Sequence, residues 1–516
     1  MHPPHFILKF MANRLDKKIL SNGNNIRKVQ QGVLNNILHD LANTKVAKKY
    51  SLENITSIEE FNRLIPVTTD LDYRELIDSI MNNNESNFFQ SKPLEFLART
   101  SGSTSDSKYI PYTKNLIKNF KRFSTNIIFK FCKLTNSYDL LDSNILVSPG
   151  NISVTKNDQG LIIGQGTGIM TLLAPKFTQK IIRPSLEILE SSTGDNKLDL
   201  MIKESFSLDI RSFSGMPTFA IAILEAVLIE AKSRGIIASN ILDIWPNLKA
   251  YSYSGSSIKP YEEKLRELTG PDIPYLEVYS ATETPIGFQY ELNKGGLCLD
   301  LESAFFQFQE SDQALDSKKL TADQVKLGKH YRILMTTYGG LLSYRIGDVV
   351  EFLSLNPPLF KVLGREKEEL NMTGNEQFSL SMIKKFLQSI YKKYNFSPKL
   401  FFVCPYLENT KKGYHWCFEV EESEYEVLSN MSNDIKTSLD EDLKASNHGY
   451  LVSREADFLL ISPMFSIVPV GTIKNYILAE KVFGQGKFLS VYNTSEETDK
   501  FFTYVDKSKI NIKSFK

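Results

Sequence analysis

The apolar residues near the N-terminus are spaced as in helices. In "TSIEEFNRLIPV", Ser57 and Glu60 have the spacing of a capping box, and Pro66 ends the helix. The first 90 residues are therefore predicted to be largely helical. After them, "KPLEFLART" has Leu94, Phe96 and Ala98 at alternate positions, which predicts a strand.

A second apolar pattern follows directly. In "TKNLIKNFKRFSTNIIFKF" the apolar positions recur with the period of an amphipathic helix: Leu116, Ile117, Phe120, Phe123, Ile127 and Phe131. The segment between strand and helix, "RTSGSTSDSKYIPYT" (99–113), is rich in small hydroxyl residues. Loops at such junctions often bind ligands in α/β proteins.

The middle of the chain alternates short strands with helices. The runs "NILVSP", "LKAYSYSG" and "YLEVYSAT" predict strands, and 216–234 and 258–269 predict helices. From about 290 to 365, strand-like runs separated by turn residues predict an antiparallel subdomain or a small β-barrel.

The pattern changes near Gly364. Beyond it we predict a helix over 380–393, a strand over 399–405, a helix over 424–444 and a strand over 456–461. The predicted fold is α/β, with a large multi-subdomain N-terminal domain (1–365) and a smaller α+β C-terminal domain (366–516).

Composition narrows the possible partners. The 516 residues include 61 Lys+Arg and 60 Asp+Glu, so no global charge favours nucleic acid or an anionic membrane. The N-terminus is a poor signal peptide, and no run of eighteen residues is both apolar and uncharged. We expect a monomeric cytoplasmic protein that binds neither nucleic acid nor membrane.

The four cysteines give no sign of a metal site. Cys132, Cys298, Cys404 and Cys417 are scattered, without a CxxC pair or a nearby histidine cluster. We expect reduced thiols in the core and no structural zinc.

The loop at 99–113 has two interpretations. It differs from a Walker A sequence, because Gly102 stands six residues before Lys108 and Tyr109 follows the lysine. Taken alone, such a segment is more often a surface turn than a phosphate site. The glycines of "GQGTGI" (164–169) are also predicted to form a turn.

Two later motifs follow predicted strands. "YSGSS" (253–257) has small residues that would let a flat base approach the backbone, or is simply a turn in which Ser257 caps a helix. "VYSATET" (278–284) offers Glu283, a carboxylate suited to Mg²⁺ beside phosphates, or an exposed loop acid.

Two further motifs carry charge. In "SYRIGDVVEF", Asp348 could accept both hydroxyls of a ribose, or is an ordinary turn aspartate. In "GREKEELNMTGNEQF", Arg365 precedes a charged run that is otherwise typical of a solvated linker.

The order of these motifs is similar to that of the adenylate-forming superfamily. Within it, the chain most resembles the auxin-responsive acyl acid amido synthetases of the Gretchen-Hagen type. The resemblance covers nearly the whole chain and includes "TSGSTSDSKYIPYT", "IWPNLK", "VYSATETPIGF", "GKHYRILMTTYGGLLSYRIGDVV" and "GQGK".

The resemblance implies ATP-dependent activation of a small carboxylic acid as an acyl-adenylate, followed by attack of an amino-acid amine. It implies that Lys108, Glu283 and Lys487 are catalytic and that Glu283 holds Mg²⁺. Tyr279 would lie by the adenine, Thr282 near the α-phosphate, and Asp348 with Arg365 at the ribose. The complete set implied to bind ATP or AMP is Ser101, Gly102, Ser103, Thr104, Ser105, Gly255, Ser256, Tyr279, Thr282, Asp348 and Arg365.

The resemblance also implies a mobile C-terminal domain. Lys367 would be its hinge, and Lys487 would assist adenylation, with Lys474 of "GTIKN" as the competing lysine. The chain departs from the family pattern at Asp106 and Ser107, where a glycine is usual, and at Phe488 and Leu489. We expect Asp106 to face solvent or to cap a backbone amide.

Two other functions remain open. One is a thioester ligase that transfers the acyl group to coenzyme A or a carrier thiol. The other is a catalytically silent binding protein on the same fold. The acid pocket is expected among 120–131, 216–219 and 286–288, although apolar stripes at helical spacing usually belong to the core.

Overall fold

The structure is a computed structural model. It describes residues 4–83, 87–100, 108–147, 155–158, 160–191, 195–255, 258, 261–292, 294–311, 313–314, 317–365, 369–370, 372, 376, 378–396, 398, 400–408, 411–455, 459–479, 495–508, 510 and 512–515. The chain separates into two compact units. The larger contains Met1–Thr100 and Lys108–Arg365, and the smaller contains Glu366–Lys516.

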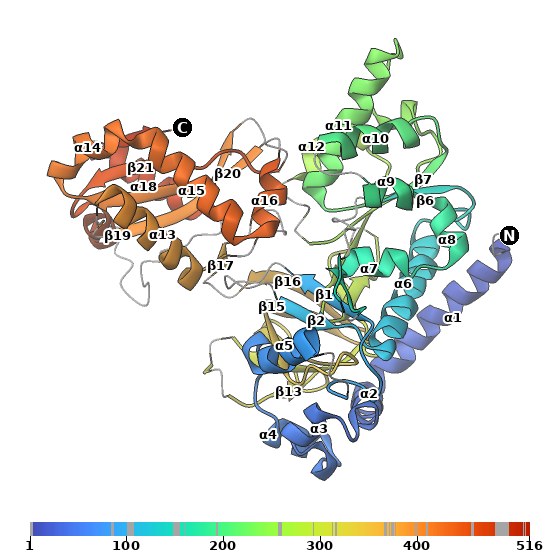
Figure 1. Cartoon of the computed structure of the whole chain (residues 1–516). Helices are drawn as coiled ribbons and strands as arrows, with labels where there is room; N and C mark the ends of the chain where they lie inside the picture. The colour runs from blue at the N-terminus through green and yellow to red at the C-terminus, as the bar shows by residue number, and fades with distance from the viewer. Residues whose placement is uncertain are drawn as a thin grey trace. The chain divides into compact units, whose positions relative to one another are not determined.

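The N-terminal segment is helical, as predicted. Its helices are α1 (His5–Gly23), α2 (Ile26–Leu41), α3 (Lys45–Lys49), α4 (Ile58–Leu64) and α5 (Arg74–Asn83), with short 3₁₀ turns η1 (Leu52–Asn54) and η2 (Asp70–Tyr73). Ser57 caps α4 by accepting a hydrogen bond from the Glu60 amide at 3.2 Å. The Glu60 carboxylate accepts from the Thr56 amide at 2.8 Å, one residue before the predicted partner. The helix α6 (Lys114–Leu134) is also confirmed and runs beside α1 (Figure 1).

A four-stranded sheet is built from strands on both sides of α6 in the sequence. Its order is β2–β1–β5–β4, with bounds β1 (Phe96–Thr100), β2 (Lys108–Pro111), β4 (Thr155–Lys156) and β5 (Ile162–Gln165). β1 and β5 are parallel, and α7 (Gly166–Leu172) begins directly after β5. The prediction of a turn over 164–169 is therefore wrong, because Gly164 belongs to a strand and Gly166 starts a helix.

One twelve-stranded sheet forms the centre of the larger unit. Its parallel half is β6 (Ile182–Arg183), β3 (Asn144–Val147), β7 (Ile210–Ser214), β8 (Ala250–Tyr253) and β9 (Tyr275–Ser280). The connecting helices are α8 (Lys176–Ile181), α9 (Leu186–Ser191), α10 (Asp195–Ser205), α11 (Pro217–Ser233) and α12 (Glu262–Thr269), with η3 (Ile241–Asp243). α12 begins at Glu262 rather than near 258, and Ser257 lies outside the described residues.

The antiparallel half continues the same sheet. Its strands, in spatial order, are β10 (Pro285–Gln289), β11 (Leu297–Leu299), β16 (Pro358–Arg365), β15 (Tyr344–Leu355), β14 (His330–Thr337), β12 (Ala304–Glu310) and β13 (Leu320–Thr321). The strands expected over 290–365 are thus antiparallel, as predicted, and are hydrogen-bonded to the parallel strands through the β9–β10 pair. A hydrogen bond joins Tyr279 on β9 to Asp348 on β15, although β10, β11 and β16 lie between these two strands. The sheet is therefore strongly curled between β9 and β15.

The smaller unit is an α+β domain. A four-stranded sheet, β19 (Leu400–Glu408), β20 (Lys411–Val420), β21 (Met464–Pro469) and β22 (Lys513–Phe515), and the hairpin β17 (Glu369–Leu370) and β18 (Phe378–Ser379) are joined by helices. These are α13 (Leu380–Tyr394), α14 (Tyr425–Asn430), α15 (Ser432–Ser446), α16 (His448–Arg454), α17 (Thr472–Ala479) and α18 (Ser495–Lys507), with η5 (Glu422–Glu424).

Two predictions for the smaller unit need correction. The helix predicted over 424–444 is two helices separated at Met431. Of the strand predicted over 456–461, residues 456–458 lie outside the described residues; in the rest, Leu460 makes only an isolated bridge with Lys412, and the continuous strand is Met464–Pro469.

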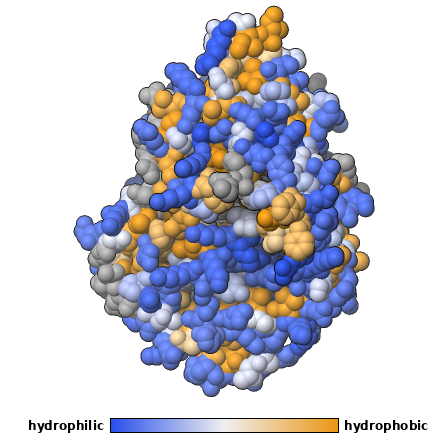
Figure 2. Space-filling view, turned by 90° about the vertical axis from the view of Figure 1, so that its right-hand side faces the viewer, coloured by the Kyte–Doolittle hydropathy of each residue, from blue (hydrophilic) through white to orange (hydrophobic). Residues whose placement is uncertain are grey.

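The cysteines and the surface also bear on the sequence predictions. All four cysteines are buried and have free thiols, as predicted. In the described part of the chain, no helix combines the length and apolar character needed to cross a membrane. On the face shown in Figure 2, hydrophobic residues are scattered among hydrophilic ones.

Candidate active site

The motif "VYSATET" forms the end of β9 and the turn into β10. The Ala281 amide donates to the Thr284 carbonyl at 3.0 Å and closes this turn. The Glu283 side chain within it is buried, at 8 % exposure. A register shift between Pro285 and Gly287 places a bulge beside Tyr279, a feature that often re-aims side chains near active sites.

Tyr279 and Asp348 are brought together from distant parts of the sequence. The Tyr279 hydroxyl donates to Oδ2 of Asp348, which is buried at 8 % exposure. The Tyr279 ring also lies 5.9 Å from the Phe360 ring. Of the described residues predicted to bind ATP, these two are in direct contact.

A bulge in β15 positions Asp348. Arg332 of β14 faces Val349, whereas Leu334 faces Arg345, so three residues of β15 lie opposite Ile333 alone. The middle one, Gly347, has a φ of +90°, which a residue with a side chain rarely adopts. On the β14 side, Asp348 is therefore the last residue of an irregular segment.

Arg365 and Gly255 lie at other strand ends. Arg365 ends β16 and faces Asp348 in the β15–β16 register. Gly255 follows β8 with a φ of +84°, and a Cβ there would lie 3.0 Å from Sδ of Met216. Both positions fit the predicted arrangement of motifs at strand ends.

Lys108 is ion-paired in the structure. It begins β2 opposite Thr100, and its Nζ lies 3.5 Å from Oδ1 of Asp70, with about a fifth of each side chain exposed. Asp70 comes from the N-terminal helical segment, where no motif singled it out.

Several predicted site residues lie outside the described residues. These are Ser101, Gly102, Ser103, Thr104, Ser105, Asp106, Ser107, Ser256, Lys367, Lys487, Phe488 and Leu489. Lys474 belongs to α17. The roles of all these residues remain predictions.

A polar network that the sequence did not indicate supports the turn from behind. Nη2 of Arg122 donates to Oδ2 of Asp300 at 2.6 Å and to Oγ of Ser303 at 2.9 Å. Nδ2 of Asn119 and Oγ1 of Thr284 both donate to the Ser303 carbonyl, at 2.7 and 3.0 Å. Thr284 is the neighbour of Glu283, so α6 is linked through this network to the proposed site.

The positive charge of Arg122 in this network is paired with the carboxylates of Asp300 and Glu302. Burial alone would lower the pKa of the Arg122 guanidinium, but the carboxylates of Asp300 and Glu302 outweigh burial and raise it. Asn119 and Arg122 stand three residues apart on α6, on a helix that the apolar pattern alone defined.

Tyr112 and Gly166 also approach the turn. A Cβ built on Gly166 would overlap the Tyr112 hydroxyl oxygen and lie 3.3 Å from Cγ2 of Thr282. The start of α7 therefore lies beside the Thr282–Glu283 turn. The signal for Gly166 was present in "GQGTGI", although the glycines of that segment predict a turn.

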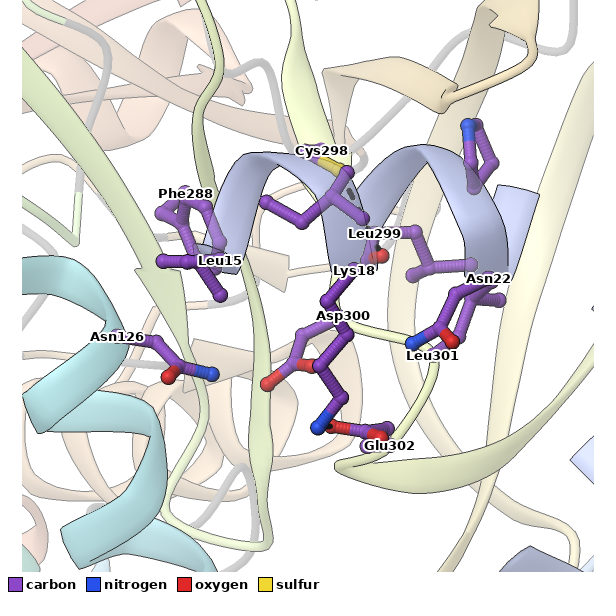
Figure 3. A pocket seen from close by; sticks show the side chains of 12 residues that line it. Leu15, Lys18, Asn22, Asn126, Phe288, Cys298, Leu299, Asp300, Leu301 and Glu302 are labelled. Atoms are coloured by element: carbon purple, nitrogen blue, oxygen red, sulfur yellow. Dashed lines mark hydrogen bonds and ion pairs between the residues drawn. The ribbon is translucent and has the colours of Figure 1, made fainter. Parts of the chain in front are cut away.

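A cavity opens beside α1 (Figure 3). Its lining includes Lys18, Asn126, Phe288, Asp300 and Glu302, and Nζ of Lys18 lies 2.7 Å from Oε2 of Glu302. Asn126 and Phe288 belong to two of the three segments expected around the acid. The lining described for this cavity includes no residue of 216–219.

Magnesium could be held at the turn only together with a substrate. Among the described residues, no group of three or more His, Cys, Asp or Glu side chains has the arrangement of a metal site. Mg²⁺ commonly uses one or two protein carboxylates together with substrate phosphates and water. The single buried carboxylate of Glu283 fits that mode.

Solved structures share the fold. The acyl acid amido synthetase AtGH3.15 in complex with 2,4-DB aligns with a TM-score of 0.60 and 16 % identity, over 97 % of each chain. A 2-hydroxyisobutyryl-CoA ligase in its thioesterification state aligns with a TM-score of 0.57 and 12 % identity, over 94 % of this chain and 92 % of the ligase. The α/β fold predicted from the sequence is thereby confirmed.

Sequence relatives are plant amido synthetases. The jasmonoyl–L-amino acid synthetase JAR4 of Nicotiana attenuata is 23 % identical over 390 residues, which span 63 % of this chain and 66 % of the relative. The indole-3-acetic acid-amido synthetase GH3.10 of Arabidopsis thaliana is 31 % identical over 153 residues, 26 % of each chain. The matched region thus spans just under two thirds of the longer-matching relative.

Family models match more than half of the chain. Residues 16–227 match the GH3 family N-terminal domain, and residues 297–365 match the GH3 family central domain. These two ranges contain β1, Lys108, Asp348 and Arg365, and they confirm the resemblance seen in the motifs. The chain belongs to the GH3 family of acyl acid amido synthetases.

Proposed function

We propose that this protein is an ATP-dependent ligase that converts a small carboxylic acid to an acyl-adenylate and transfers the acyl group to an amino-acid amine. The observation that carries the proposal is the convergence of Tyr279 and Asp348, two motif residues 69 positions apart, beside the Thr282–Glu283 turn. The names of the relatives support an acyl acid and an amino acid as the substrate classes.

The nucleoside would bind where Tyr279 meets Asp348. An ionised aspartate has about four acceptor positions, so the bond from Tyr279 leaves others for ribose hydroxyls. Arg365, facing Asp348 in the next strand, would bind the same ribose. Gly255 and Ser256 would let the adenine approach the backbone.

The phosphates would lie between the turn and the start of β2. Thr282 would contact the α-phosphate, and Ser101, Gly102, Ser103, Thr104, Ser105 and Lys108 would bind the β- and γ-phosphates. Mg²⁺ held by Glu283 would neutralise phosphate charge in the bound state.

The reaction needs no covalent protein nucleophile. In the first half, a carboxylate oxygen of the acid attacks the α-phosphorus, and pyrophosphate leaves. In the second half, the amine nitrogen attacks the acyl carbon, AMP leaves, and the nitrogen loses a proton. Because each step joins or separates anions, the protein contributes mainly positioning and positive charge.

The smaller unit would serve both halves by changing its position, with Lys367 as hinge and Lys487 or Lys474 delivered to the adenylation step. This part of the proposal rests on the resemblance, because Lys367 and Lys487 lie outside the described residues.

Pyrophosphate and AMP release across a library of small acids tests the proposal. We expect pyrophosphate release that depends on the acid, AMP release stimulated by amino acids, and an amide identified by mass spectrometry. Glu283→Gln should reduce adenylation by about 100-fold or more. The exposed Glu267→Gln is the matched control and should be unchanged.

The other functions would give different results. Acyl transfer to coenzyme A and not to amines would identify a thioester ligase. Absence of both ATP binding and turnover with every acid would identify a silent relative and refute the proposal.

A further inference from the structure

The hydroxyl of Tyr112 is placed between three parts of the proposed site. The Tyr112 ring is buried, at 2 % exposure, and stacks on Phe120 with centroids 5.6 Å apart. Its hydroxyl oxygen lies so close to Gly166 that a Cβ there would overlap it, and Thr282 borders the same point. Tyr112 thus reaches from the end of β2 to the Thr282–Glu283 turn.

This hydroxyl makes no hydrogen bond with the described part of the chain. The ring is buried, but the hydroxyl oxygen is not one of the fully buried polar atoms that lack a partner among the described residues, so water can reach it. The ring cannot turn away without losing its stack on Phe120. A hydroxyl that is fixed beside the Thr282–Glu283 turn and has no partner in the described residues is available to a ligand that replaces water there.

The chemistry of the group allows it to donate to an acceptor. Burial, reinforced by the negative charge of Glu283, raises the pKa of the Tyr112 hydroxyl, so the proton stays on the oxygen at working pH. The adjacent Thr282 is the residue proposed to contact the α-phosphate. The nearest anionic acceptor of a bound nucleotide is then an α-phosphate oxygen.

We propose that Tyr112 donates a hydrogen bond from its hydroxyl to a non-bridging α-phosphate oxygen of ATP and of the acyl-adenylate. The proposal rests on the proposed function, since it needs a nucleotide at this turn. Negative charge on these oxygens grows as the carboxylate attacks. A fixed donor there therefore lowers the activation barrier of adenylation in addition to binding ATP.

The test compares AMP with adenosine, which differ by the phosphate alone. By calorimetry, Tyr112→Phe should weaken AMP binding by about 10-fold or more and leave adenosine binding unchanged. Acid-dependent pyrophosphate release should fall by about 10- to 100-fold in kcat. The pH profile should keep its shape, because Tyr112 transfers no proton.

A matched control comes from the smaller unit. The Tyr391 hydroxyl is buried and has no hydrogen-bond partner in the described residues, and its ring packs on Phe396 at 5.0 Å. Tyr391→Phe should leave both ligand affinities and turnover unchanged. Melting temperatures of both variants should match the parent, which separates a ligand contact from loss of structure.

Gly166→Ala gives a second, steric test. The added Cβ would displace the hydroxyl in the parent and lower the preference for AMP over adenosine. In a Tyr112→Phe background the remaining neighbours of the Cβ would be Cγ2 of Thr282 at 3.3 Å and ring Cζ at 3.4 Å, so Gly166→Ala should have a smaller effect than in the parent.

The outcomes distinguish the two proposals. If the parent turns over acids and prefers AMP to adenosine, but Tyr112→Phe behaves identically, the Tyr112 contact is refuted and the proposed function stands. If the parent neither turns over nor prefers AMP, both fail.

Discussion

Tyr279 on β9 donates a hydrogen bond to Asp348 on β15, although β10, β11 and β16 lie between these strands in the sheet. With neighbouring strands about 4.8 Å apart, four steps along a flat sheet would separate β9 from β15 by roughly 19 Å. Two side chains cannot span that distance, so the sheet must curl to bring the motifs together. The hydrogen bond therefore links the curvature of the sheet to the proposed nucleoside site.

Loss of this link should be seen in ATP binding. Tyr279→Phe keeps the ring against Phe360 but frees Asp348, and we expect the KM for ATP to rise about 3- to 10-fold. Asp348→Asn should raise it further, by about 10-fold or more, because the ribose hydroxyls lose a charged acceptor. Tyr290→Phe is a suitable tyrosine control. Unchanged KM values in both site variants would refute the placement of the nucleoside beside Tyr279 and Asp348.

Asp70 should compete with ATP for Lys108. The pair is partly exposed, and such pairs contribute about 1 kcal/mol or less. Asp70→Asn should therefore lower the KM for ATP by about 2- to 5-fold, since the lysine no longer has to leave a carboxylate. The exposed Asp78→Asn on α5 is the control. An increase in KM would instead mean that Asp70 holds Lys108 in its working position.

Arg122 and Asp300 should be strongly coupled in stability. Arg122→Leu leaves the buried Asp300 carboxylate with the Ser303 hydroxyl but without its counter-ion, and we expect a loss of about 2 kcal/mol in the free energy of unfolding, reduced by the partial exposure of Arg122. Adding Asp300→Leu should recover part of this loss. Urea denaturation followed by Trp245 fluorescence, in a Trp416→Phe background, measures the larger unit. Strictly additive losses would mean that the two side chains do not interact energetically.

The smaller unit should lose stability in mild acid. Burial lowers the pKa of His415 from its ordinary value of 6.5 to about 3, and its Nε2 lies 2.7 Å from the Ser466 hydroxyl. Between these values the unfolded chain binds a proton that the folded chain does not, so stability falls as pH decreases. Lowering the pH from 7 to 5.5 should cost about 1 kcal/mol through His415.

Trp416 fluorescence in a Trp245→Phe background would follow this unit. His415→Gln should reduce the pH dependence by that amount, whereas the exposed His39→Gln should not change it. An equal pH dependence in His415→Gln would assign the effect to another group.

The sequence predicted those parts of the fold in which each element carries its own signal. The apolar period of 114–134 and the cap at Ser57 are local, and both helices formed as expected. The errors arose where tertiary contacts decide the outcome. Nothing in the apolar pattern of 424–444 marks the break at Met431, and the glycines of 164–169 form the end of a strand and the start of a helix only because β5 pairs with β1.

The motifs likewise indicated Tyr279 and Asp348, but not why they meet. Their contact depends on the curl of the sheet and on a bulge, neither of which has a periodic signature. Tyr112 and Arg122 were missed for a different reason. Both lie in or next to the apolar pattern that defines α6, so the pattern does not distinguish them from core residues. Arg122 is distinguished only by its contact with Asp300, and Tyr112 only by its buried position beside the turn.

The bulge in β15 also limits the length of the chain at this point. Side chains along a strand alternate between its two faces, so inserting or deleting one residue between Arg345 and Val349 would turn Asp348 to the opposite face or shift every pair beyond it. A substitution at Ile346 keeps the register of the strand, whereas a change in residue count does not. In relatives of this chain the number of residues in that segment should therefore vary less than their identities.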